Sequence, residues 1–160
     1  MNSSNDLSEL IAVARSDAQA LQKQLSEHSE PTINAQDNEA LLSKLESAAI
    51  DIHSLFEARM QHHFKRGPFS RKLKALLLSA EKTDLADRVH QYYLAINVLK
   101  HGKGASYREL LAMADTFIVM VPATDSADDT ETRLVDVQSQ DFFNGLCDTL
   151  QEAYQFLTAH

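Results

Sequence analysis

Glycine and proline are scarce in this chain, with four glycines and three prolines in 160 residues. These two residue types end helices and interrupt strands, so their scarcity predicts long uninterrupted elements. Apolar residues recur at spacings of three and four, which is typical of amphipathic helices. The first such stripe, over residues 5–28, contains Leu7, Leu10, Ala14, Ala18, Leu21 and Leu25. The chain is therefore predicted to be mainly α-helical.

The same pattern continues along the chain and predicts a bundle of four to five helices in one domain, residues 1–160. Gly67 and Pro68 end the second helical segment, because proline cannot continue a helix. Parallel α/β folds need repeated alternation of strands and helices, which this sequence lacks. Beyond residues 5–28, helices are expected over about 38–63, 70–80 and 83–100, with a short one from 106 and a last one from 139.

One segment departs from the helical pattern. TFIVMV, residues 116–121, is rich in β-branched residues, and RLVDV, residues 133–137, alternates apolar and polar positions. Both features are typical of strands. A polar, acidic stretch joins them. We therefore expect a β-hairpin over about 116–137, before the last helix.

The number of cysteines and the composition of the N-terminal residues indicate in which cellular compartment the protein is expected. Cys147 is the only cysteine, so an intramolecular disulfide and a cysteine-based zinc site are both excluded. It lies in the apolar run FFNGLCDTL, where a free cysteine is usually buried and inert. The first residues, MNSSNDLSEL, lack the apolar segment of a signal peptide. No apolar run approaches the roughly 20 residues that cross a bilayer. We expect a cytoplasmic protein without membrane contact.

Charge is unevenly distributed along the sequence. The formal net charge is -8, but the span from Arg59 to Arg108 holds eleven basic and three acidic residues, whereas the rest holds four and twenty. Such asymmetry can mark a surface that binds anions. It is equally explained by acidic helices that pack beside basic ones. Both interpretations stay open at this point.

The most basic stretch is ARMQHHFKRGPFSRKLK, residues 58–74. Phe64 and Phe69 alternate with cations that include Arg66 and Arg71. Surfaces that bind single-stranded nucleic acid combine aromatic and basic side chains in this way. The alternative is a solvated helix end whose phenylalanines face the core.

Metal and cofactor sites are not expected. His53 and Glu57 lie one helical turn apart, and His62 and His63 follow them. This is not the H-E-x-x-H pattern of zinc enzymes, and adjacent histidines on a helix point about 100° apart. The phosphate-loop pattern G-x-x-x-x-G-K-[ST] is also absent.

The segment HGKGASYREL, residues 101–110, has a structural explanation. Gly102 suits the residue that follows a helix, and Lys100 and His101 suit the last turn, near the negative end of the helix dipole. Ser106 and Glu109 match the capping box S-x-x-E. These residues can therefore form a corner between two helices.

That explanation does not account for Asn97 and His101. They are four residues apart, so they share one helix face, next to the apolar stripe. They could form a hydrogen-bonded network that stabilises the bundle. Alternatively, His101 could transfer protons as a general acid and base, with a phosphate held by Lys100, Lys103 and Arg108.

INVLKHG, residues 96–102, resembles the signature of HEPN-like domains. Their motif is an Arg, often followed by Asn, with a His five positions after the Arg. Asn97 matches the polar second position and His101 matches the catalytic His, whereas Ile96 occupies the Arg position. The resemblance covers about residues 36–112 and implies a helical bundle.

Many HEPN-like domains are metal-independent ribonucleases of toxin–antitoxin and anti-phage systems, and they dimerise so that two motifs share one interface. The resemblance implies a homodimer that binds RNA or nucleotide. His101 would be the acid and base, Asn97 would orient it or the phosphate, and the RNA 2′-hydroxyl would attack. Ile96 in place of the Arg favours a lapsed or weak ribonuclease that binds its ligand.

A second hypothesis is a non-enzymatic interaction or regulatory protein, such as an antitoxin. In that case the same polar residues would be structural. The partner protein would bind to the acidic terminal helices or to the basic span. Burial of His101 within its own chain would favour this hypothesis, and exposure beside clustered cations would favour the first.

Overall fold

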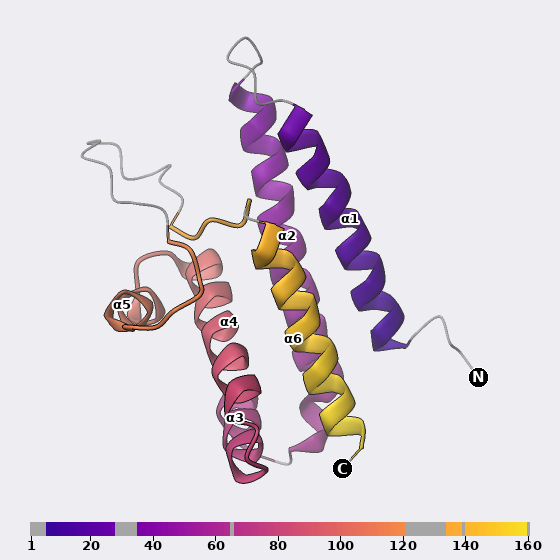
Figure 1. Ribbon diagram of the computed structural model, residues 1–160, viewed down its shortest axis with the longest axis vertical. Coiled ribbons are helices and arrows are strands. Elements are labelled where there is room, and N and C mark those ends of the chain that lie inside the picture. Colours follow the sequence, from indigo (N-terminus) through magenta and orange to yellow (C-terminus); the bar gives the residue numbers. More distant parts are fainter. Residues whose placement is uncertain (1–5, 28–34, 65, 121–133, 139, 160) are drawn as a thin grey trace.

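The computed structural model describes residues 6–27, 35–64, 66–120, 134–138 and 140–159. These residues form a mainly helical structure, as predicted (Figure 1). Among them, no helix is both long enough and apolar enough to span a membrane. The α-helices of the described residues are α1 (Leu7–Glu27), α2 (Ala35–Met60), α3 (Phe69–Ser79), α4 (Thr83–His101), α5 (Ala105–Ala112) and α6 (Gln140–Thr158), with a 3-10 turn at Gln61–His63.

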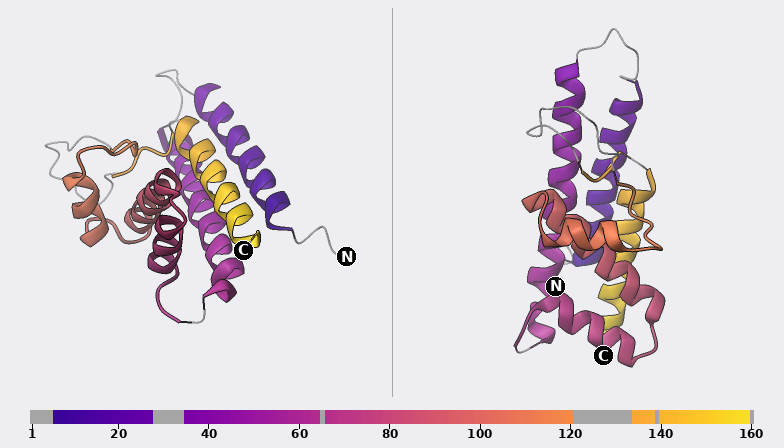
Figure 2. Two further views of the ribbon diagram at one scale, coloured as in Figure 1. Left: turned by 60° about the horizontal axis from the view of Figure 1, so that its bottom comes forward. Right: turned by 90° about the vertical axis from the view of Figure 1, so that its left-hand side faces the viewer.

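Four long helices form the bundle. α2 and α6 lie in the middle, α1 packs on both from one side, and α4 packs on both from the other (Figure 1). The shorter helices α3 and α5 pack on α4. They therefore lie on the side of the bundle opposite α1, as both views in Figure 2 show. The cations that α3 and α5 carry therefore lie on one side of the molecule.

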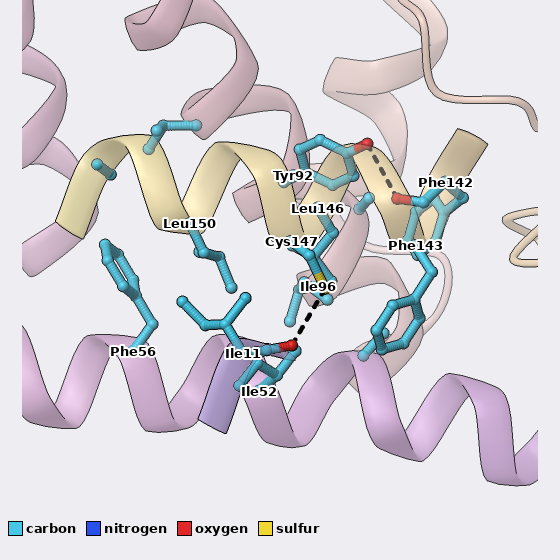
Figure 3. Packing of buried hydrophobic residues seen from close by; sticks show 14 of the residues in the cluster. Ile11, Ile52, Phe56, Tyr92, Ile96, Phe142, Phe143, Leu146, Cys147 and Leu150 are labelled. Carbon is cyan, nitrogen blue, oxygen red and sulfur yellow. Dashed lines mark hydrogen bonds between the residues drawn. The ribbon is translucent and has the colours of Figure 1, made fainter. Parts of the chain in front are cut away.

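The core lies where the apolar stripes of the helices meet. Leu45 of α2, Ala95 of α4 and Leu146 of α6 are completely buried. Figure 3 shows Phe56 and Ile96 directed into the same region. Cys147 is also completely buried, and burial raises the pKa of its thiol to about 11. The predicted burial of Cys147 in the core is confirmed.

Helices α4 and α6 approach each other closely at a glycine. The Tyr92 hydroxyl donates a hydrogen bond of 3.0 Å to the Phe142 carbonyl oxygen (Figure 3). A Cβ atom at Gly145 would lie only 2.2 Å from that hydroxyl oxygen. The absence of a side chain at Gly145 therefore leaves room for the tyrosine.

The predicted β-hairpin is wrong for the residues that the structure describes. They contain no strand, only an isolated antiparallel bridge between Met120 and Val135. The reason lies in the buried side chain of Gln91 on α4. Its Oε1 accepts hydrogen bonds from the Thr116 hydroxyl, at 2.7 Å, and from the Phe117 amide, at 3.0 Å.

The start of the segment thus bonds to a helix side chain instead of to a neighbouring strand. The remainder of the predicted hairpin, residues 121–133 with the acidic stretch, lies outside the described residues.

Candidate functional site

The end of α4 and the start of α5 present one histidine and three cations to solvent. His101, Lys100, Lys103 and Arg108 are all exposed. Among the described residues none of the four takes part in an ion pair. Gly102 has a positive φ of 74°, as predicted for the residue after the helix, and turns the chain between Lys100 and Lys103. His101 therefore lies beside accessible, unpaired positive charge.

Asn97 holds the α4–α5 corner together. It is half-buried, and its Nδ2 donates a hydrogen bond of 3.2 Å to the Ser106 hydroxyl. The predicted capping box is wrong, because α5 begins at Ala105 and has no side-chain cap. Glu109 instead contacts His90 Nε2 on α4 at 2.7 Å. The side chains expected to cap α5 attach it to α4.

Ile96 is a core residue. Its side chain is 1 % exposed and points among the buried residues shown in Figure 3. A guanidinium could not occupy this position without losing its hydration. The structure thus separates the three motif positions, with Ile96 in the core, Asn97 in the corner and His101 on the surface. The homodimer remains a prediction.

The basic stretch before and within α3 divides between surface and core. Arg66 and Arg71 are exposed, as is Lys72. Phe69 is buried and packs edge to face on Phe64, with ring centroids 5.5 Å apart. The phenylalanines therefore face the core, which is the alternative left open by the sequence. They offer no platform on which bases could stack.

Ion pairs hold two arginines of the described residues. Arg15 of α1 donates a 2.6 Å hydrogen bond to Asp148 of α6, and Arg88 of α4 is paired with Asp84 and Glu152. Lys23 of α1 and Lys44 of α2 form no ion pair among the described residues, and the same holds for seven cations of α3, α5 and the segments next to them. These seven, here called the basic face, are Arg66, Arg71, Lys72, Lys74, Lys100, Lys103 and Arg108.

A buried histidine lies near one end of this basic face. His53 of α2 is 5 % exposed, and its Nδ1 lies 3.7 Å from Glu57 Oε1, too far for a hydrogen bond. Within the part of the chain that the structure describes, Nδ1 has no hydrogen-bond partner. It lines a cavity of about 10 Å³ together with Glu57, Ser70 and Tyr93.

Burial, and after it the nearby charge of Lys100, lowers the pKa of His53 to about 4. Burial raises the pKa of Glu57, while Lys100 acts against that rise. The sequence paired His53 with Glu57 by spacing alone. Their link to Lys100 depends on the packing of α4 against α2, which no local pattern contains.

Comparisons with protein-family models, with curated proteins and with solved structures found no match for this chain.

Proposed function

We propose that this chain is a HEPN-like module that binds RNA through its phosphates on the basic face. The observation that carries the proposal is the unpaired state of the seven cations, on a chain with a net charge of -8. The twenty acids outside the basic span are numerous enough to have neutralised these cations. The fold instead keeps α3 and α5 on the side opposite α1, where their charges meet solvent (Figure 1).

Phosphate is the group that these cations suit best. Arginine can donate two parallel hydrogen bonds to a phosphate, and lysine contributes a compact charge. The cations are distributed over two segments that both pack on α4. A polyanion with repeated phosphates can contact both segments, whereas a single nucleotide can contact only one. RNA is therefore favoured over a free nucleotide.

The proposal is for binding without cleavage. Ile96 supplies no charge at the position of the motif Arg, and its burial leaves no room for another cation there. The amide nitrogen of Asn97 is engaged by Ser106. His101 is thus exposed. Among the described residues it forms no hydrogen bond or ion pair with a group that could assist proton transfer or stabilise the oxygen that leaves when RNA is cleaved.

The test measures fluorescence anisotropy of a labelled 20-nucleotide uridine RNA against protein concentration. The variant Lys103→Glu/Arg108→Glu should bind about tenfold more weakly or worse, with a shallower salt dependence, since each lost phosphate contact lowers the slope by about one. The matched control, Lys23→Glu/Lys44→Glu, makes the same change of charge on α1 and α2 and should bind like the wild type. Equal loss in both variants would refute a localised basic face.

Two further arms separate the alternatives. Adenosine monophosphate should fail to displace the RNA at millimolar concentration, and efficient displacement would assign the site to nucleotide instead. The RNA should remain intact in EDTA with both the wild type and His101→Ala. Cleavage by the wild type alone would establish a metal-independent ribonuclease and refute the proposal of binding without catalysis.

A further inference from the structure

An apolar groove of about 240 Å³ runs between α1 and α2. Ile52 is buried in it, Leu10 and Leu55 are half-buried, and Val13 of α1 forms an open wall that is 57 % exposed. Val13 is among the most exposed large apolar side chains of the described residues. The groove and the residues that line it are called the α1–α2 groove below. The groove is large enough to receive an apolar side chain from another surface.

Two acids accompany the groove. Asp17 of α1 and Asp51 of α2 line it, and both side chains are exposed. Neither forms an ion pair among the described residues. A surface that fits the α1–α2 groove must therefore combine a small apolar projection with positive charge on its flanks.

The chain itself carries such a surface on α3. The inner side of this helix, which includes Leu73 and Leu77, is buried. On the opposite side, Leu78 is 47 % exposed and Ala75 is exposed one turn before it. Arg71 lies four residues before Ala75, and Lys74 lies four residues before Leu78, so each cation is next to one of them on the helix surface. These four residues are called the outer face of α3.

We propose that the outer face of α3 in one copy of the chain docks into the α1–α2 groove of a second copy. Leu78 would enter beside Val13 and remove both apolar side chains from water. Arg71 and Lys74 would lie beside Asp17 and Asp51, so that unpaired charges of opposite sign meet. In each contact, one copy thus supplies the outer face of α3 and the other supplies the α1–α2 groove.

The position of the two surfaces determines the kind of assembly. α1 and α3 lie on opposite sides of the bundle (Figure 1), so a copy that donates its α3 still has an empty groove. Such a head-to-tail contact does not close on itself by two-fold symmetry and adds further copies as concentration rises. It differs from the symmetric dimer of shared motifs that the HEPN resemblance implies.

The test is sedimentation velocity over a range of protein concentrations, at low and high salt. The wild type should form species larger than a dimer, and these should dissociate in high salt because surface charges are screened. Leu78→Ser should abolish them. Leu111→Ser is the matched control, since it removes an even more exposed leucine from α5 and should leave association unchanged.

Charge reversal makes the test specific. Asp17→Lys/Asp51→Lys and Arg71→Glu/Lys74→Glu should each be monomeric, because like charges then face each other. Mixing the two variants should restore association, since each reversed surface then finds its complement. Both variants retain a negative net charge, so non-specific attraction would not account for restoration.

A monomeric wild type, or a mixture that stays monomeric, would overturn the proposal. A closed dimer that resists Leu78→Ser would also overturn it and would favour the symmetric alternative. Arg71 and Lys74 also belong to the basic face, whereas Leu78, Asp17 and Asp51 do not. Leu78→Ser and Asp17→Lys/Asp51→Lys therefore distinguish failure here from failure of RNA binding.

Discussion

His53 is a residue whose protonation differs between the folded and unfolded states at mildly acidic pH. Its imidazole is buried among Glu57, Ser70 and Tyr93, and Lys100 adds a positive charge nearby. The folded pKa of about 4 lies well below the value of 6.5 for an exposed histidine. Above pH 6.5 neither state carries the proton. Between pH 6.5 and 4 only the unfolded state does, and folding is progressively disfavoured.

This difference predicts a loss of up to about 3 kcal/mol in unfolding free energy as pH falls from 6.5 to 4. The raised pKa of Glu57 acts in the opposite direction and persists when His53 is replaced. His53→Gln should therefore flatten the acid side of the stability profile measured by urea denaturation. His62→Gln, which replaces an exposed imidazole, is the matched control. A wild-type slope in His53→Gln would contradict the buried, neutral histidine.

Sequence spacing identified which residues could carry charge, but not which would be paired. The sequence left open whether His101 is exposed or buried, and the structure places it at the exposed end of α4. Two interactions depend on contacts between different helices. They are the hydrogen bond from Asn97 to Ser106 and the effect of the Lys100 charge on the pKa of His53. Such contacts are set by the packing of the whole bundle.

At the scale of elements, the helices were predictable because their apolar stripes continue for several turns without interruption. Asp6, the residue before α1, accepts a 2.9 Å hydrogen bond from the Ser8 amide. The hairpin was not predictable in the same way. Residues 116–120 have strand-like composition, yet their first hydrogen bonds go to Gln91. Among the residues that the structure describes, pairing between the two halves of the predicted hairpin is limited to the Met120–Val135 bridge and a 2.8 Å hydrogen bond from the Asp136 amide to the Val119 carbonyl oxygen.

The contact between α4 and α6 offers a test in which two substitutions compensate. Gly145→Ala places a Cβ against the Tyr92 hydroxyl and should destabilise the protein by about 1–3 kcal/mol. Tyr92→Phe alone should cost about 1 kcal/mol, because the hydrogen bond to Phe142 is lost. In the Gly145→Ala background, however, Tyr92→Phe should restore stability, since the clashing oxygen is removed. Urea denaturation of the four proteins measures this reversal of sign, and additive losses would refute it.

At the scale of the whole molecule, the fold preserves and sharpens the charge asymmetry of the sequence. The linear order of charges could have been cancelled by packing basic helices against acidic ones, as for Arg88 with Glu152. Instead, α3 and α5 pack on α4 through apolar faces and leave their cations in solvent. The choice between these outcomes could not be made from composition.

Because of this separation of charge, the electrostatic force between the molecule and a polyanion differs between high and low ionic strength. The Debye length is about 8 Å at 0.15 M salt, much shorter than the roughly 39 Å of the 26-residue helix α2. A polyanion near the basic face then senses local cations only. At 0.01 M the Debye length grows to about 30 Å, and the net charge of -8 is felt as repulsion. A plot of log affinity for RNA against log salt should therefore bend downward below about 0.02 M, whereas a uniformly basic protein gives a straight line.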